Sequence, residues 1–406
     1  MNIRNKKGSA SSEPFLLAYM QKEKNLWILV MVCIINSLGF GIIVPVLYSY
    51  GKTFGLTGAT LGVLTASFSV AQFFATPVLG SLSDKWGRKP LLVISLAGTC
   101  ISFLLFAEAN VLWLLFAARM LDGLTGGNVS VAQAMVADTA TAENRAKRFG
   151  ILGSSLAFGF VIGPFIGGAF DKISPQAPFF FAAGISLIGT LCAAFLLKET
   201  NPTNKQSRLN FEGKFKFKTL VTTLKRKTIG TAVFIGFLLT MAQFTMIIGF
   251  QTFSVDILKI SPITMGVFLA GFGICGIIMQ LSVPFFIKTF PSKQIILLFS
   301  SILCCAAMFL SGFTSLLIPF AIALCVYGLF NGLRNPMLNA IIADNIDKSE
   351  QGKILGINQS YASIGQTIGP LTAGLAAAIS IHSVFFLSAF YILIATLLCF
   401  RLKSKA

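Results

Sequence analysis

The sequence has few charged residues: Asp, Glu, Lys and Arg together make up 11% of its 406 residues. A soluble domain carries about 25%, and the mean hydropathy of this chain is +0.81. The polar surface that a water-soluble globule needs is therefore missing. These numbers exclude a soluble enzyme, a secreted disulfide scaffold and a disordered tail, and they predict an all-α membrane protein.

Histidine is almost absent, since His382 is the only one in the chain. A single imidazole excludes a histidine metal cluster and a Ser/His/Asp triad. The eight cysteines all fall inside apolar segments, where buried thiols are expected rather than disulfides or metal ligands. The sequence also has no phosphate-binding loop of the Walker type. We therefore expect no metal, no cofactor and no enzymatic activity.

Apolar runs of about 20 residues, the length that crosses a hydrocarbon core as a helix, recur along the chain. They predict twelve transmembrane helices. The expected ranges are 27–49, 57–80, 90–109, 111–137, 147–170, 178–197, 229–250, 262–286, 293–313, 315–343, 353–379 and 381–401.

Acidic residues are scarce as well, with 14 against 32 Lys and Arg and a net charge of +18. The basic residues are spread over many loops, which argues against a nucleic-acid partner. Of the 32, 27 fall in segments that would lie on one side of the membrane. The positive-inside rule then predicts a multi-pass protein of the bacterial inner membrane with both termini in the cytoplasm, surrounded by the lipid bilayer.

An internal repeat divides the chain into halves. At an offset of 206 residues Asp138 matches Asp344 and Pro164 matches Pro370, within a longer series of matches that needs no gap. This predicts two pseudo-symmetric six-helix bundles, an architecture of rocking transporters, in a chain that acts as a monomer. The expected divisions are a cytoplasmic N-terminal segment 1–26, an N-terminal bundle 27–197, a basic cytoplasmic linker 198–228, a C-terminal bundle 229–401 and a cytoplasmic tail 402–406.

Four segments together resemble a known family. They are GSLSDKWGRKPLL (Gly80–Leu92), LFAARMLDGLTGGN (Leu115–Asn128), GFVIGPFIGG (Gly159–Gly168) and NSLGFGIIVPVL (Asn36–Leu47). They are similar to motifs of the major facilitator superfamily, and within it of the twelve-helix drug:proton antiporters such as the tetracycline exporters. The resemblance implies a small-molecule substrate that is exported by alternating access in exchange for protons, with the proton gradient as the energy source.

The first motif contains the residues that we call the latch residues: Gly80, Asp84, Gly87, Arg88 and Asp138. The two glycines permit a tight reversal between helices, and an anion at position 84 is favoured at a helix N-terminus. Arg88 is placed to pair with Asp138. We expect Asp84 and Arg88 to stabilise the outward-facing state. The alternative is that the basic residues of this loop only set topology.

The motif in the fifth expected helix contains the hinge residues: Gly159, Gly163, Pro164, Gly167 and Gly168. Its glycines let helices approach closely, and its proline removes one backbone hydrogen bond and permits a bend. Ordinary small-residue packing would explain the same pattern. The link between this hinge and export in exchange for protons comes from the family resemblance.

Charges at membrane depth are costly and usually functional. Arg119 and Asp122 lie on one face of the fourth expected helix, in a stripe that continues to Gln133. We assign proton coupling to this pair, with a permanent ion pair as the alternative. The tetracycline exporters have an acidic residue in the first helix where this chain has Asn36, so coupling by that route is not available here.

Arg334 has no acidic residue within a helical turn. It either pairs with a distant group or backbone carbonyls, or binds an anionic substrate. The second hypothesis is therefore a transporter of an organic anion, such as a carboxylated metabolite or siderophore, that uses Arg119 and Arg334. A transport-dead membrane sensor is the third.

The predicted substrate cavity contains Asn36, Arg119, Asp122, Gln133, Gln243, Asn331, Arg334, Asn335, Asn358 and Tyr361. Gln72, Gln359 and Gln366 are further polar candidates, for which an interhelical hydrogen bond is favoured over a ligand contact.

Overall fold

The computed structural model describes residues 12–141, 144–201, 217–346 and 351–402. Within these ranges the secondary structure is helical and no strand occurs. Eleven of the described helices are long and apolar enough to cross a membrane. The expectation of an all-α membrane protein is confirmed.

The N-terminal bundle is built from the first seven helices. Their bounds are α1 Ser12–Lys52, α2 Gly58–Trp86, α3 Arg88–Ala107, α4 Leu112–Thr125, α5 Asn128–Thr139, α6 Arg145–Asp171 and α7 Ala177–Leu196.

A short helix, α8, lies at Phe217–Leu224, inside the segment 198–228 that the sequence indicated as a linker. The C-terminal bundle follows. Its bounds are α9 Lys227–Thr252, the π-helix η1 Phe253–Ile257, α10 Pro262–Leu281, α11 Val283–Thr289, α12 Lys293–Ser311, α13 Leu317–Asp344, α14 Gln351–Ile379 and α15 Ile381–Cys399.

The fourth expected helix is not continuous, which corrects the expected range 111–137. It breaks at Gly126 and Gly127 into α4 and α5, each too short to span a membrane alone. Two consecutive glycines lack the side chains that would favour a helical backbone, and the amide of Gly127 donates to Thr125 O at 2.7 Å instead of continuing the helical ladder. Hydropathy could not reveal this break, because both halves are apolar.

Other expected ranges also change at their ends: the helix expected at 27–49 begins at Ser12, and the one expected at 57–80 continues to Trp86. The helix expected at 229–250 continues through η1 to Ile257, and the helix expected at 262–286 ends at Leu281 and is followed by α11. Pro284, at the start of α11, fits a new helix because its missing amide hydrogen is not needed in the first turn.

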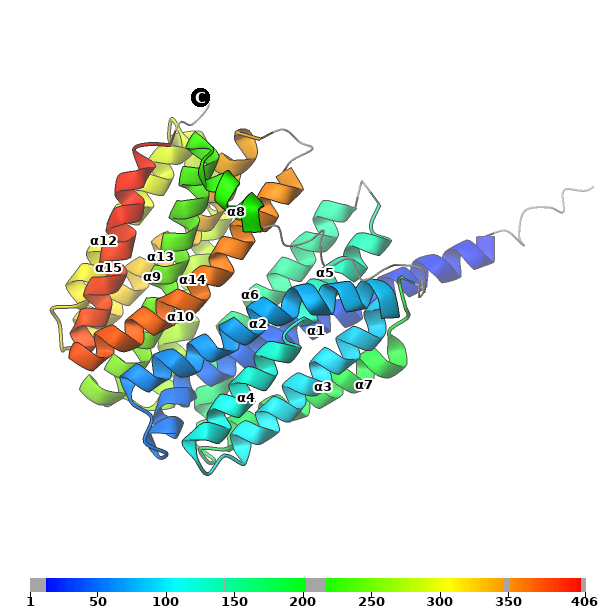
Figure 1. The fold of residues 1–406 in the computed structure, drawn as a ribbon, viewed down its shortest axis with the longest axis horizontal. Coiled ribbons are helices and arrows are strands. Elements are labelled where there is room, and N and C mark those ends of the chain that lie inside the picture. The colour runs from blue at the N-terminus through cyan, green and yellow to red at the C-terminus, as the bar shows by residue number, and fades with distance from the viewer. Residues whose placement is uncertain (1–11, 142–143, 202–216, 347–350, 403–406) are drawn as a thin grey trace, which may run out of the picture.

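The two bundles meet at one end and spread apart toward the other (Figure 1). We call the end that contains Arg88, Arg148 and Lys293 the basic face, and the end that contains Tyr48 and Asp256 the opposite face. Figure 1 shows the spread on the side of α8, which belongs to the basic face.

Close backbone contacts hold the bundles together near the opposite face. A Cβ atom at Gly62 of α2 would lie 2.8 Å from Gly374 Cα of α14, and one at Gly168 of α6 would lie 2.5 Å from Ile263 Cα of α10. Such approaches are possible only without side chains. The structure is therefore closed at the opposite face and open toward the basic face.

Apolar side chains fill both bundles and also coat their outside. One large cluster, which includes Phe250, Phe320 and Phe385, occupies the C-terminal bundle, and two others occupy the N-terminal bundle. Large side chains such as Phe195 and Ile379 remain exposed on the outer surface. An apolar exterior of this kind is suited to lipid.

Candidate functional site

A cavity of about 280 Å³ lies between α2 and α14, where the two bundles separate. Ordinary ligand pockets begin at about this size. The cavity is lined by Ser69, Gln72, Phe73, Thr76, Pro77, Gln359, Ser360, Ser363 and Gln366. None of these side chains is charged, and amides and hydroxyls surround one aromatic ring.

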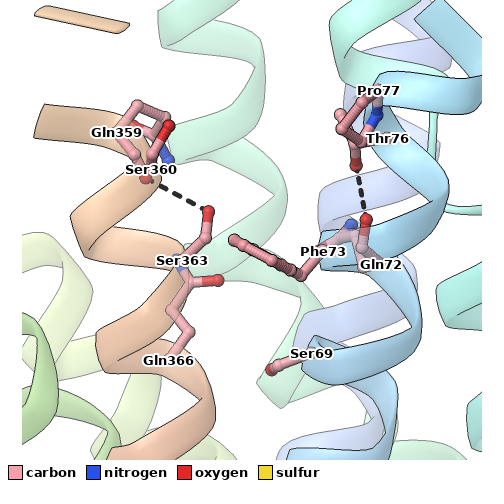
Figure 2. Close-up of a pocket in the computed structure, with 9 residues that line it drawn as sticks. All are labelled: Ser69, Gln72, Phe73, Thr76, Pro77, Gln359, Ser360, Ser363 and Gln366. Atoms are coloured by element: carbon pink, nitrogen blue, oxygen red, sulfur yellow. Dashed lines mark hydrogen bonds between the residues drawn. The ribbon is translucent and has the colours of Figure 1, made fainter. Parts of the chain in front are cut away.

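The position of the cavity follows from how α2 and α14 cross. The helices touch at Gly62 and Gly374 near the opposite face, and the lining residues begin two turns further toward the basic face. Figure 2 shows Phe73 reaching from α2 toward Ser363 of α14. The cavity therefore lies against both bundles, and a rocking motion would change its shape.

The predicted substrate cavity and this cavity are formed by different residues. None of the ten residues predicted for the substrate cavity is among its nine lining residues. Gln72, Gln359 and Gln366, for which interhelical hydrogen bonds were favoured, are lining residues. A signal was present, because Gln359, Ser363 and Gln366 share one face of a helix. The pairing of α14 with α2 was not visible in one sequence.

Arg119 lies inside the N-terminal bundle, where 4% of its surface is exposed. Its guanidinium stacks over the rings of Phe68 of α2 and Phe106 of α3, at 5.7 and 5.5 Å. Its Nε has no hydrogen-bond partner in the described part of the chain. Arg119 therefore packs between α2, α3 and α4 and is not a lining residue of the cavity.

Asp122 is half-buried on the same helix. Its polar neighbours are Arg119 and the hydroxyl of Thr99 on α3. The ion pairs formed by the described residues do not include one between Asp122 and Arg119. The guanidinium stacks on aromatic rings, which explains why the pair expected from their spacing is not a direct contact.

Arg334 is almost fully buried in the C-terminal bundle, with 1% exposed. Its Nη2 donates to Tyr327 Oη at 3.1 Å and its Nε donates to Asn331 Oδ1 at 3.1 Å. The guanidinium also lies 5.1 Å from the centre of the Tyr327 ring. The expected polar face of α13 is thus present. Tyr327 and Asn331 bind the guanidinium inside the bundle, and its Nη1 has no hydrogen-bond partner among the described residues.

The remaining predicted cavity residues are dispersed over both bundles. Asn36 accepts a hydrogen bond from Asn128 Nδ2 at 3.1 Å, and Asn358 donates to Asn339 Oδ1 at 3.3 Å. Tyr361 is in edge contact with the ring of Phe237. Three others make no such polar contact with the described residues and range from half-buried to exposed: Gln133, Gln243 and Asn335.

The expected contact between Arg88 and Asp138 is present, with Nε 3.2 Å from Oδ2. Arg88 Nη1 also lies 2.6 Å from Asp84 Oδ1. Gly87 adopts a φ of 101°, which only glycine adopts easily, and so permits the reversal between α2 and α3. Gly80 lies inside α2 and not at the reversal, which corrects the expectation for this glycine, and a Cβ there would meet open space.

The backbone amides of Arg88 and Lys89 also donate to the carboxylate of Glu199, which follows α7. An anion is favoured there because these amides form the N-terminus of α3. The sequence predicted Asp84 as the anion at a helix N-terminus, but Asp84 lies in the last turn of α2, and Glu199, which sequence reasoning missed, occupies such a position. Together with Asp84 and Asp138, it connects the start of α3 to α2, α5 and the end of α7 within one bundle.

The hinge residues pack α6 against α1 and against the other bundle. A Cβ at Gly163 would lie 2.9 Å from Gly41 Cα of α1, and Gly159 and Gly167 are pressed against Ser37 and Ile42 of the same helix. The proline between them, Pro164, lies within α6 without ending it. Gly168 instead contacts α10, so this helix belongs to the interface between the bundles.

A polar contact also joins the bundles at the opposite face. Lys52 Nζ of α1 lies 2.5 Å from Asp256 Oδ1 of η1, and Tyr48 Oη donates to Asp256 Oδ2 at 2.6 Å. We call these three residues the clasp. The sequence shows that charged residues are few on this side of the membrane, and this scarcity was a signal that Lys52 and Asp256 matter. It does not show that the two side chains would meet.

The sequence model of the Major Facilitator Superfamily matches residues 29–317 and 233–406. The quinolone resistance protein NorA of Staphylococcus aureus is 28% identical over 87% of this chain and 89% of its own. The class B tetracycline resistance protein of Escherichia coli is 29% identical over 85% of this chain and 86% of its own. Multidrug resistance protein 2 of Bacillus subtilis is 28% identical over 95% of this chain and 97% of its own.

The fold has solved counterparts. A bacterial homologue of the human lysosomal transporter Spinster, in an inward-facing and occupied conformation, superposes with a TM-score of 0.75 at 13% identity. The similarity covers 94% of this chain and 96% of that one. At this identity it supports the fold alone. The two family-model matches together span nearly the whole chain, the relatives match over almost their full length, and the fold is helical in two bundles. This protein is therefore a membrane transporter of the major facilitator superfamily.

Proposed function

We propose that this transporter exports planar aromatic compounds that carry several hydrogen-bonding groups, of which quinolones and tetracyclines are examples. The observation that carries the proposal is the neutral cavity between α2 and α14, where Phe73 offers a ring face among amides and hydroxyls. Aromatic stacking with a few polar contacts is how such pockets hold drug-sized ligands. The resistance proteins named above support the same substrate class.

The orientation of the proposed export follows from charge. The basic face would lie in the cytoplasm of a bacterial cell, with both termini, because positively charged loops remain there. The described conformation would then be open to the cytoplasm and ready to accept a substrate. One chain contains both bundles around the cavity, which is consistent with a monomer as the working unit.

The proposed energy source is the proton gradient, without a cofactor, and Asp122 is the proposed proton carrier. In the described part of the chain it is the only carboxylate near the middle of an expected span. Placing a carboxylate at that depth in the membrane costs free energy, and residues of this kind usually have a function such as carrying a proton. Arg119 is its charged neighbour.

The organic-anion hypothesis receives less support from the geometry. It needs Arg119 and Arg334 in contact with substrate, whereas both lie inside separate bundles among aromatic and neutral partners. An uncharged cavity favours compounds without net charge, including zwitterions. The latch contacts are formed within one bundle in a conformation open toward the basic face, so they do not by themselves favour the outward-facing state, and that role stays a prediction. The hinge residues keep their proposed role in the motion of α6.

Transport by purified protein in liposomes tests the proposal. An imposed pH gradient, acidic on the outer side, should accelerate movement of norfloxacin or tetracycline, and Asp122→Asn should remove the acceleration because an amide cannot carry the proton. Asp171→Asn, at the end of α6, is the matched control and should keep it.

Two results would contradict the proposal. Gradient-driven transport that persists in Asp122→Asn would show that another group carries the proton. If neither compound moved in the unchanged protein, the proposed substrate class would be wrong.

A further inference from the structure

Gln72 is in contact with both the cavity and the broken helix. Its side chain lines the cavity on α2, and its Nε2 donates a hydrogen bond to the backbone carbonyl of Gly126 at 3.1 Å. That carbonyl belongs to the junction between α4 and α5. One amide therefore connects the space where a substrate would sit to the helix that carries Asp122.

The carbonyl of Gly126 is available to Gln72 because the helix is interrupted there. In a continuous helix it would accept from the amide of Ser130, four residues later. Instead α5 begins at Asn128, and its first ladder bond runs from Val131 N to Gly127 O at 3.0 Å. The side chain of Gln72 thus donates the hydrogen bond that the amide of Ser130 would donate in a continuous helix, and it stabilises the break between α4 and α5.

Asp122 lies one helical turn before Gly126. Between them, the hydroxyl of Thr125 donates to Leu121 O at 2.9 Å, and the side chain of Thr125 is packed against Gly98 of α3. Gly98 adjoins Thr99, the hydroxyl neighbour of Asp122. A change at the junction therefore reaches the surroundings of the carboxylate through directly packed atoms.

The charged surroundings of Asp122 are simple. Arg119 is its charged neighbour on α4, and Thr99 faces it from α3. The other helix packed against α4 is α2, which has no titratable side chain before Asp84. A shift of the α4 backbone would thus change few interactions other than those with Arg119 and Thr99.

We propose that Gln72 couples occupancy of the cavity to the proton on Asp122. A substrate carbonyl or carboxylate oxygen accepts the hydrogen bond of Gln72 and displaces the carbonyl of Gly126. That carbonyl then accepts from the amide of Ser130, and α4 and α5 join into one helix. Asp122 moves relative to Thr99 and Arg119, and its carboxyl group loses its proton to water. This inference rests on the proposed function and names the coupling residue within it.

The proposal also narrows the substrate class. A compound must place a hydrogen-bond acceptor within reach of Gln72 while its ring lies on Phe73, the next residue along α2. Keto-acid quinolones meet this requirement. An aromatic compound without an acceptor would bind on the ring without releasing the proton.

The experiment measures protons released per norfloxacin bound. Purified protein in lipid nanodiscs is titrated in weak buffer, with a pH-indicator dye for protons and equilibrium dialysis for bound norfloxacin. Gln72→Met keeps the length of the side chain and removes the donor. It should lower the proton yield per bound molecule severalfold, while norfloxacin affinity falls by about two- to tenfold, as expected for one neutral hydrogen bond.

Two further variants make the test specific. Gly126→Ala would place a Cβ 2.8 Å from Gln72 Nε2 and so displace the amide without altering a cavity side chain; it should show the same loss of proton yield. Gln366→Met faces the cavity from α14. It should weaken norfloxacin binding but leave the number of protons per bound molecule unchanged.

The outcomes separate the two proposals. A normal proton yield in both Gln72→Met and Gly126→Ala would overturn the role of Gln72 and leave the proposed function standing. An equal loss in Gln366→Met would also overturn it, because any lining residue would then suffice. If the unchanged protein bound norfloxacin without releasing protons, proton-coupled export would be wrong, and this coupling with it.

Discussion

At the scale of single residues, the burial of Arg334 weighs against the organic-anion hypothesis. An arginine that binds an anionic substrate has to reach the substrate, yet this guanidinium is held by Tyr327 and Asn331 inside the C-terminal bundle. Its position is that of a packing residue. The same reasoning applies to Arg119, which is covered by Phe68 and Phe106.

We predict that Arg334→Gln affects transport of charged and neutral compounds alike. The substitution disturbs the packing of α13 but changes no charge in the cavity, so rates for norfloxacin and for a carboxylated fluorescein should fall by the same factor, within about twofold. Everted membrane vesicles provide the measurement. Asn335→Ala, exposed on the same helix, is the control. Selective loss of the anionic compound would instead favour the anion hypothesis.

At the scale of helices, glycine contacts determine which ends of the bundles meet. Gly62 of α2 and Gly374 of α14 allow the two backbones to touch near the opposite face. The cavity exists because this contact is not repeated toward the basic face, where Gln and Ser side chains separate the same two helices.

We predict that Gly62→Val opens the opposite face. The added side chain cannot fit against Gly374, so the population should shift toward the conformation in which α2 and α14 separate there. A cysteine introduced at Ser69 should then react with an impermeant maleimide from the outer side at least about threefold faster. Gly184→Val, where a Cβ meets open space, is the control. Unchanged reactivity would contradict the prediction.

The helices themselves could largely be predicted from the sequence, because crossing a membrane requires a long apolar run and little else. The break at Gly126 could not, since interrupting a span does not alter its hydropathy. The cavity could not either. Its lining depends on α2 lying beside α14, a tertiary contact between residues nearly 300 positions apart. Arg119 and Arg334 were predicted as cavity residues because burying a charge in a membrane costs free energy. That cost does not indicate whether the side chain points into a cavity or into its own bundle.

At the scale of the whole molecule, the clasp opposes separation of the bundles at the opposite face. Lys52 and Tyr48 of α1 both contact Asp256 of η1, so the bundles cannot separate at the opposite face without breaking these contacts. The pair is partly exposed, with 47% of the Lys52 side chain accessible. Its contribution should therefore be modest and sensitive to salt.

We predict that Asp256→Asn raises the ratio of outward-open to inward-open protein by about two- to fivefold, the range for an exposed ion pair. Distances between spin labels on the α6–α7 and α12–α13 connections provide the measurement. Lys52→Gln should give a similar shift, and Lys172→Gln, on the same face, should give none. High salt should reduce the difference between Asp256→Asn and the unchanged protein. A ratio that does not change would rule out the clasp as a determinant.

The uncharged lining of the cavity has a consequence for energetics. If a substrate without net charge leaves while one proton enters, each cycle moves one positive charge inward. The membrane voltage then drives export alongside the pH difference, contributing about 2.3 kcal/mol per 100 mV for each turnover. A carrier that exported an anion, bound by arginines in its cavity, would move a different net charge per cycle, so the membrane voltage would contribute a different free energy. Under the proposed proton exchange, a carrier with neutral amides and hydroxyls around Phe73 would be electrogenic and could use the membrane voltage even at neutral external pH.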